Sequence, residues 1–183
     1  MVLFLDRDGV INVRTPGDYV KTPEEFVFEY KVPEAIRLLR PFFDRIVILT
    51  NQSGIGKGVM TESQLTDVHA VLLAGIRNAG GQIDGIYFCP HLPDSGCGCR
   101  KPAIGLALRA QADFPDIRFS EAWLVGDSVC DMDLALALGA RTVLIEGKTE
   151  EASRLADMPL QHRFNSLWDF ARWYAVSSFS ATK

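Results

Sequence analysis

The sequence predicts an α/β fold, built as a single Rossmann-like, doubly wound and mostly parallel sheet. Short strand-like apolar runs recur at residues 2–5, 46–49, 86–88, 123–125 and 142–145. The segments between these runs are long enough for helices, and such alternation is typical of a parallel sheet with right-handed connections. Polar residues follow the runs, at the edge where these sheets bind their ligands.

The segments between the predicted strands carry helix signals. Pro33 lies in the first turn of a helix predicted at residues 33–39, and Pro41 closes it. Thr61 and Gln64 form a capping box, after which apolar residues recur at helical spacing (Leu65, Val68, Leu72 and Ile76) until a Gly-Gly pair. Further helices are predicted at residues 103–112, 131–138 and about 167–175.

Length and composition bound the classes of protein to which the chain can belong. With 183 residues, 48% of them hydrophobic and 23% charged, it fits one domain over residues 1–183 whose core needs no disulfides. A net charge of −4 argues against a general affinity for nucleic acid. No apolar stretch approaches the roughly 18 residues of a membrane span, and no basic leader precedes the first strand. We therefore expect a cytoplasmic monomer that binds neither membranes nor nucleic acid and acts on a small molecule.

Two carboxylates, Asp6 and Asp8, follow the first predicted strand directly. Side chains two apart on an extended segment point the same way, so both are expected to face one site. Such a cluster of negative charge is costly unless a cation or a shared proton relieves the repulsion. The pair therefore indicates a hard divalent metal ion such as Mg²⁺, without which one aspartate would become protonated.

Polar residues at three later positions form a set with this pair. The loop after the second strand contains hydroxyl and amide side chains (Thr50, Asn51, Gln52 and Ser53) and two glycines, so it predicts either a phosphate cradle or a plain turn. Arg100 and Lys101 offer two adjacent cations suited to a transferring phosphoryl group. Asp127 follows the fourth strand as a further metal ligand, whereas Asp131 is interpreted as a helix cap.

Three of the four cysteines lie within the segment 89–99, in the pattern C-x-H-x5-C-x-C. Its side chains (Cys89, His91, Cys97 and Cys99) make a complete tetrahedral set for structural Zn²⁺, and a disulfide is the competing interpretation. Because Cys99 directly precedes Arg100, closing a zinc loop would fix the direction of the two cations. Cys130 stands apart as a core or near-site residue.

The order and strand context of these motifs resemble the haloacid dehalogenase-type phosphatases over roughly residues 1–150. The resemblance implies that Asp6 attacks phosphorus and that Asp8 acts as general acid and base. It also implies that Thr50 and Lys101 bind the phosphoryl oxygens. Mg²⁺ would be held by Asp6, the carbonyl of Asp8, and Asp127. No sizeable insert occurs at the usual cap positions, so we expect a capless, open site.

The cysteine loop resembles the zinc-binding subgroup of this family, which contains heptose bisphosphate phosphatases and histidinol-phosphate phosphatases. Residues 6–12, 19–20 and 50–56 look closest to the heptose branch, while the short loop looks equally like the histidinol branch. The substrate implied is a small phosphorylated sugar, with histidinol phosphate as the alternative. A receiver-like signalling domain is the alternative of another class. The predicted substrate-binding residues are Arg14, Tyr19, Thr50, Asn51, Gln52, Ser53, Arg100 and Lys101.

Overall fold

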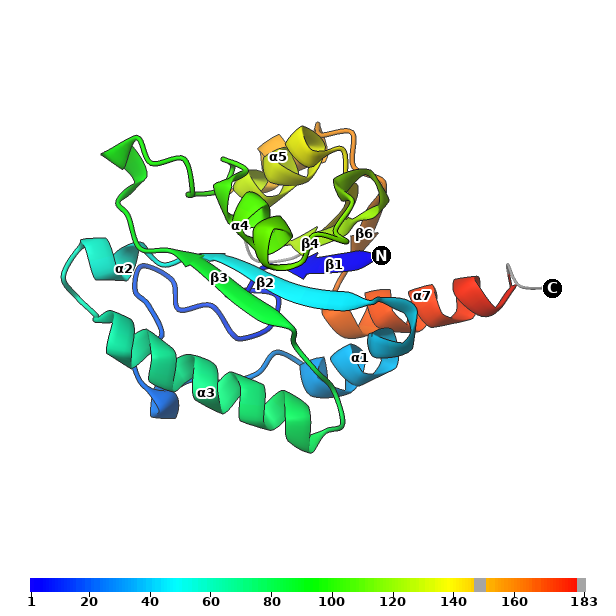
Figure 1. The fold of residues 1–183 in the computed structure, drawn as a ribbon, viewed down its shortest axis with the longest axis horizontal. Helices are drawn as coiled ribbons and strands as arrows, with labels where there is room; N and C mark the ends of the chain where they lie inside the picture. Colours follow the sequence, from blue (N-terminus) through cyan, green and yellow to red (C-terminus); the bar gives the residue numbers. More distant parts are fainter. Residues whose placement is uncertain (147–150, 181–183) are drawn as a thin grey trace.

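The computed structural model describes residues 1–146 and 151–180, and these form a six-stranded sheet in which every neighbouring pair is parallel (Figure 1). The strand order is β3-β2-β1-β4-β5-β6. The strands are β1 (Val2–Leu5), β2 (Arg45–Asn51), β3 (Gly85–Cys89), β4 (Trp123–Gly126), β5 (Arg141–Ile145) and β6 (His162–Phe164). This order reverses between β1 and β4, so the carboxyl ends of these two strands border the crevice in which doubly wound sheets bind ligands.

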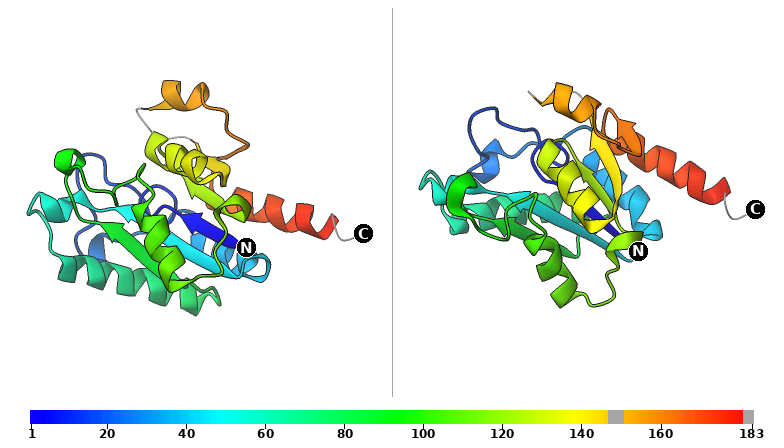
Figure 2. Two further views of the ribbon diagram at one scale, coloured as in Figure 1. Left: turned by 45° about the horizontal axis from the view of Figure 1, so that its top comes forward. Right: turned by 90° about the horizontal axis from the view of Figure 1, so that it is seen from above.

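Helices cover both faces of the sheet, which confirms the doubly wound fold (Figures 1 and 2). One face carries α1 (Val32–Leu39), α3 (Glu62–Asn78) and α7 (Leu167–Ser180), and the other carries α4 (Gly105–Asp113) and α5 (Val129–Leu138). Shorter elements are α2 (Ser53–Gly56), α6 (Ala152–Ala156) and the 3-10 turns η1 (Pro23–Glu25), η2 (Arg40–Phe42), η3 (Pro93–Ser95) and η4 (Phe119–Glu121). In the described chain only η1 stands between β1 and α1, and only α2 between β2 and α3, so no separate cap covers the sheet.

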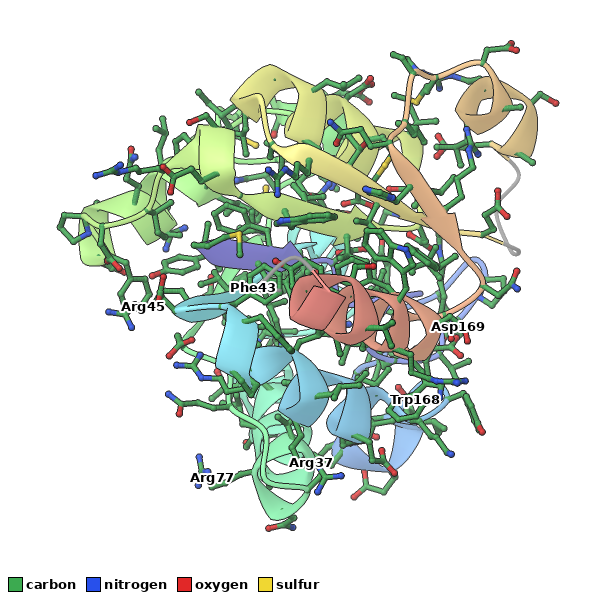
Figure 3. All side chains as sticks on the ribbon, turned by 90° about the vertical axis from the view of Figure 1, so that its right-hand side faces the viewer. Arg37, Phe43, Arg45, Arg77, Trp168 and Asp169 are labelled. Atoms are coloured by element: carbon green, nitrogen blue, oxygen red, sulfur yellow. The ribbon has the colours of Figure 1, made fainter. Side chains whose placement is uncertain are left out.

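The strands divide the core into two halves because their side chains alternate between the faces. On β1, Leu3 and Leu5 pack with the α1, α3 and α7 side, while Val2 and Phe4 pack with the α4 and α5 side. All four are essentially inaccessible to solvent, as expected for a central parallel strand buried on both faces. Figure 3 shows α7 lying against α1, and its Phe170 packs in the first half of the core.

Most predicted helices occur close to their expected ends. The capping box of α3 is confirmed, since Gln64 N donates to Thr61 Oγ1 at 3.2 Å and Thr61 N donates to Gln64 Oε1 at 2.8 Å. The helix predicted at 103–112 begins later, at Gly105, because Ala103 N donates to Arg100 O in a turn. The short β6 was not predicted, because its three residues gain their strand conformation by pairing with β5.

None of the helices in the described part of the chain combines the length and the apolar character that crossing a bilayer requires.

Candidate active site

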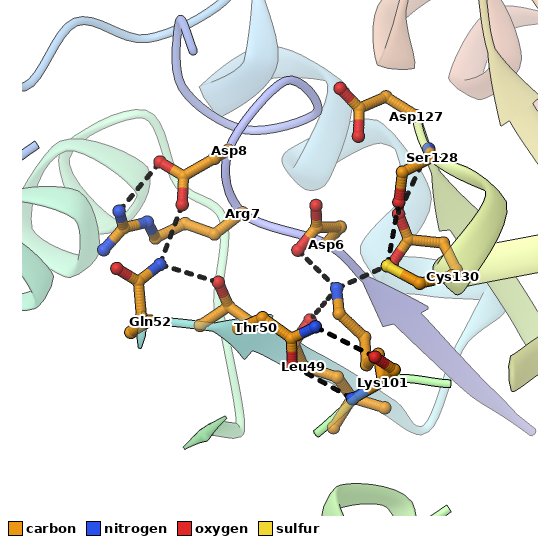
Figure 4. Close-up of polar contacts among 12 residues, drawn as sticks. Asp6, Arg7, Asp8, Leu49, Thr50, Gln52, Lys101, Asp127, Ser128 and Cys130 are labelled. Carbon is orange, nitrogen blue, oxygen red and sulfur yellow. Dashed lines mark hydrogen bonds and ion pairs between the residues drawn. The ribbon is translucent and has the colours of Figure 1, made fainter. Parts of the chain in front are cut away.

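The carboxyl ends of β1, β2 and β4 bring the predicted acidic and hydroxyl residues together (Figure 4). Asp6 follows β1, and its N–H donates to Val125 O of β4 at 2.9 Å. Thr50 is buried near the end of β2, and Asp127 follows β4 directly. The site therefore lies where the strand order reverses.

A buried lysine links the end of β1, strand β2 and helix α5. The Lys101 ammonium donates to Asp6 Oδ1 and Asp131 Oδ1, both at 2.6 Å, and to Leu49 O at 2.8 Å. Burial by itself would lower the pKa of Lys101, but the carboxylates of Asp131 and Asp6 outweigh it and raise that pKa. Asp131 thus has two roles, because it also accepts from Ser128 N at 3.2 Å as part of the α5 capping box. The sequence predicted only the capping role.

The lysine backbone is fixed by an asparagine from β2. Asn51 Oδ1 accepts from Lys101 N at 3.0 Å, and Asn51 Nδ2 donates to Lys101 O at 3.2 Å. These two hydrogen bonds fix the Lys101 backbone in the position from which its ammonium group contacts Asp6. Asn51, which the sequence predicted to bind substrate, is therefore hydrogen-bonded to the backbone of Lys101 in the structure.

The acidic cluster is poorly neutralised by the protein alone. Oxygens of Asp6, Asp127 and Asp131 all lie within 4.8 Å of one another. Burial raises the pKa of Asp6 to about 8, because the Lys101 ammonium only partly offsets it and the neighbouring carboxylates add to it. Burial and Asp131 raise the pKa of Asp127 to about 7. A hard cation fits this oxygen set, since it would relieve both the desolvation and the repulsion.

The backbone beside the cluster leaves no room for a larger residue. Gly9 has φ +94°, a conformation that residues with a Cβ rarely adopt. A Cβ there would also lie 2.1 Å from Asp127 Oδ2. The glycine after Asp8 is therefore required for Asp127 to approach β1.

Asp8 has hydrogen-bond partners different from those of Asp6. The chain leaves the extended conformation after β1, and Ile11 N turns back to donate to Arg7 O at 2.8 Å. Asp8 accepts from Arg7 Nη2 at 2.7 Å and Gln52 Nε2 at 2.8 Å (Figure 4). It also accepts from Asn12 Nδ2 at 2.9 Å. Burial would raise the pKa of Asp8, but these donors, led by the Arg7 guanidinium, lower it.

The loop after β2 contacts Asp8 and Thr50 and does not form an open phosphate cradle. Three of its N–H groups are used by the fold, because those of Gln52, Ile55 and Gly56 donate to backbone carbonyls. The buried Gln52 side chain donates to Thr50 Oγ1 at 2.8 Å as well as to Asp8. Thr50 is thus held beside Asp8 at the edge of the sheet.

An outer rim of cationic and hydroxyl groups lies beside this loop. Ser53 Oγ and Tyr19 Oη are 3.0 Å apart, and Lys57 Nζ lies 5.3 Å from the centre of the Tyr19 ring. Arg100 also acts electrostatically on Tyr19, and its buried Nη1 has no hydrogen-bond partner in the described chain. Lys57 was not predicted, although a lysine between two glycines in a strand-end loop could have drawn attention. Arg14 lies on the opposite side, 3.6 Å from Asp127 Oδ2 through its Nη1.

The four predicted zinc ligands come together at the end of β3. Cys89 Sγ lies 3.6 Å from Cys97 Sγ and 3.3 Å from Cys99 Sγ, and His91 Nδ1 lies 3.3 Å from Cys99 Sγ. All four cysteines of the chain are free thiols, so the disulfide alternative is wrong. A tetrahedral ion with Zn–S bonds of about 2.3 Å places its sulfurs about 3.8 Å apart, which these spacings approach. The cluster could therefore hold a metal ion.

The cysteine loop is packed closely on α4. Gly105 N donates to Gly98 O at 3.1 Å, and a Cβ on Gly105 would lie 2.2 Å from that same oxygen. The loop thus contacts a helix of the fold immediately before the chain continues into Arg100 and Lys101. A hollow of about 520 Å³ opens beside the loop, but no catalytic carboxylate lines it; its residues are Ile55, Gly56, Glu62, Pro90, His91, Leu92, Asp94 and Ser95.

Cys130 lies near the site and outside the cysteine cluster. Its Sγ is 3.1 Å from Ser128 Oγ, and burial together with Asp131 raises its pKa to about 12. It therefore remains a thiol at neutral pH.

Comparison with known proteins gives consistent relatives. Residues 98–170 match the HAD-hydrolase-like family model. The chain is 44% identical over 150 residues to D-glycero-beta-D-manno-heptose-1,7-bisphosphate 7-phosphatase of Pseudomonas putida, covering 81% of this chain and 85% of the relative. It is 39% identical over 174 residues to the corresponding alpha-heptose phosphatase of Mycobacterium tuberculosis, covering 92% and 88%. The crystal structure of D,D-heptose 1,7-bisphosphate phosphatase from B. bronchiseptica, complexed with magnesium and phosphate, superimposes with a TM-score of 0.86 at 29% identity, covering 96% and 98%.

A histidine behind the site gives a testable pH dependence. Burial, and then the Arg7 guanidinium, lower the pKa of His69 to about 4 from its ordinary 6.5. The unfolded chain binds the extra proton between these values, so the free energy of unfolding falls as the pH falls through this range. Between pH 7 and 5 we expect His69 to account for a loss of about 2 kcal/mol.

Urea unfolding of the wild type and of His69→Gln at both pH values measures this contribution. The wild type should lose more stability than the variant on acidification. Parallel losses in the two proteins would contradict the assignment.

Proposed function

Because the chain belongs to the heptose-1,7-bisphosphate 7-phosphatase family of the HAD-like hydrolases, we propose that it removes the C7 phosphate of D-glycero-D-manno-heptose 1,7-bisphosphate. It is a phosphoric monoester hydrolase. The observation that carries the mechanism is the buried set of Asp6, Lys101 and Asp127 with Asp8 held separately beside it. Asp6 thereby lies among carboxylates and one lysine, whereas Asp8 lies among hydrogen-bond donors.

We propose that Asp6 is the nucleophile. Lys101 binds its Oδ1 and leaves Oδ2 for attack on phosphorus, which forms an aspartyl phosphate as the bond from phosphorus to the C7 oxygen breaks. The donors around Asp8 keep it ionised in the free protein, so it must take up a proton from solvent as the ester binds. It gives this proton to the leaving oxygen. It then takes a proton from the water that attacks the aspartyl phosphate, which releases inorganic phosphate, restores the Asp6 carboxylate and returns Asp8 to its protonated form. Thr50 and Lys101 would bind the phosphoryl oxygens.

We propose Mg²⁺ at the acidic cluster, held by Asp6, the carbonyl of Asp8, and Asp127. The raised pKa values of Asp6 and Asp127 support a cation there, because burial and then the neighbouring carboxylates disfavour the ionised form of both groups. When bound, Mg²⁺ would supply the charge that keeps Asp6 ionised and reduces its repulsion from phosphate.

We propose that the outer rim binds the phosphate that does not react. Arg100 contributes an unpaired buried N–H, and Lys57, Tyr19 and Ser53 lie beside it with further donors. Such charge suits a second phosphate better than it suits the cationic amine of histidinol phosphate. The curated relatives are named for both the alpha and the beta heptose anomer, so both anomers belong in the assays.

The free cysteines and the possible zinc site support a reducing compartment, so we propose that the enzyme acts in the cytoplasm. The expected monomer and the expected lack of affinity for nucleic acid stay predictions from the sequence.

We expect Mg²⁺-dependent phosphatase activity that is abolished in Asp6→Asn and reduced about 10²- to 10⁴-fold in Asp8→Asn, because the first change removes the nucleophile and the second removes the proton donor. Release of inorganic phosphate measures both effects. The control is Asp67→Asn, an exposed carboxylate on α3 that should retain full activity. Wild-type turnover by purified Asp6→Asn would refute the mechanism.

We expect one tightly bound Zn²⁺ per chain on the cysteine cluster, measured by elemental analysis of protein purified without chelators. Removing it should lower thermal stability and activity while the sheet stays folded, because the chain is long enough to form a core without the metal, whereas the loop leads directly into Lys101. The double variant Cys97→Ala, Cys99→Ala should lose the metal, and Cys130→Ala should keep it. Absence of zinc from the wild type, or full activity of the double variant, counts against this site.

We expect kcat/KM for the heptose bisphosphate to exceed that for histidinol phosphate at least tenfold, which is about 1.4 kcal/mol of transition-state stabilisation. Arg100→Ala and Lys57→Ala should each narrow this gap by weakening binding of the second phosphate. Arg77→Ala removes an exposed cation of α3 and serves as the control. A preference for histidinol phosphate would reject the heptose substrate and leave the catalytic assignments intact.

A further inference from the structure

Arg7 is the largest side chain that the structure buries completely, and it lies behind the acid/base carboxylate. Its Nη2 donates to Asp8 Oδ1 at 2.7 Å, and its Nη1 lies 3.4 Å from Nε2 of His69 on α3. The Nε atom has no hydrogen-bond partner in the described chain. The side-chain acceptors that fix the guanidinium are therefore Asp8 on one side and the His69 ring on the other.

Chemistry fixes the direction of the contact between Arg7 and His69. An arginine side chain stays protonated and can only donate, so Nε2 of His69 must be the acceptor and the ring proton must lie on Nδ1. The ring is neutral at pH 7, in keeping with its burial and with the adjacent positive charge. The Phe88 ring of β3 packs edge-on against it, with the centroids 6.4 Å apart. His69 is thus a fixed acceptor supplied by a helix that contributes no group to the phosphoryl site.

We propose that His69 is a positioning residue for the phosphatase reaction: it accepts from Arg7 and thereby holds Asp8 in the orientation from which it protonates the leaving oxygen. The inference rests on the proposed function, since it takes Asp8 as the proton donor. Asn12 and Gln52 also donate to Asp8, but both belong to the loops that follow β1 and β2. The link through Arg7 alone ties Asp8 to α3.

Loss of the acceptor should act on proton transfer more than on binding. Without His69, two of the three guanidinium nitrogens of Arg7 would be buried without partners, a costly state that favours rotation of the side chain. Asp8 would then lose its shortest hydrogen bond and its alignment. An alkyl phosphate such as the heptose ester needs a proton on its leaving oxygen, whereas p-nitrophenolate leaves readily without one. The ratio of the two rates therefore reports on the alignment of Asp8.

The experiment compares two substitutions of similar volume, His69→Gln, which keeps an acceptor, and His69→Met, which removes it. kcat and KM are measured with Mg²⁺ for p-nitrophenyl phosphate and for the alkyl phosphate that the wild type hydrolyses fastest. We expect His69→Met to lower kcat about tenfold or more on the alkyl ester and less than about threefold on the aryl ester, with KM within about twofold. His69→Gln should stay within about threefold of the wild type on both esters.

Two further variants separate the possible failures, and an unfolded fraction cancels in the ratio of rates. Val68→Ala weakens the packing of α3 at a buried neighbour and should leave the ratio unchanged. Equal losses of His69→Met on both esters, absence of rescue by Gln, or an altered ratio in Val68→Ala would overturn the proposal. Asp8→Asn is measured in parallel. If it changes the ratio and His69→Met does not, the positioning role alone is wrong; if it leaves the ratio unchanged, the acid role of Asp8 in the proposed function is wrong.

Discussion

The arrangement of the active site depends on one buried cation, the ammonium group of Lys101. It lies between Asp6 and Asp131 at 2.6 Å from each and is almost inaccessible to solvent. A buried charge of this kind is tolerated only when partners and hydrogen bonds compensate for the lost hydration. The same ammonium group partly offsets the repulsion among the three acidic side chains of the cluster.

The position of that cation is set by segments far from it in the sequence. Asn51 of β2 binds the Lys101 backbone on both sides, and the cysteine loop leads directly into Arg100 and Lys101. Gly105 packs the loop on α4 at a distance that only glycine permits. A metal ion in the cysteine cluster would stiffen this path, and its influence on chemistry would pass through the orientation of the cations.

The two carboxylates of the first motif show how surroundings separate chemical roles. Asp6 is buried beside other carboxylates and one lysine. Burial and the carboxylates raise its pKa to about 8, because the lysine offsets only part of their effect. Asp8 is only two residues away, but three donors hold it and its pKa is lowered. The bend of the chain after β1 thus gives the proposed nucleophile and the proposed proton carrier different surroundings.

The sequence by itself determined the features that depend on neighbouring residues in the chain. Strand runs, the capping box of α3 and the cysteine spacing depend on residues close together in the chain, and the structure confirms each of them. Only the tertiary structure decided that Gln52 donates to Asp8, that Lys57 joins the rim, and that His69 lies beside Arg7. These contacts join residues up to 62 positions apart, as for Arg7 and His69. A local pattern reports periodicity and capping, whereas such pairings are fixed when helices and strands pack around one core.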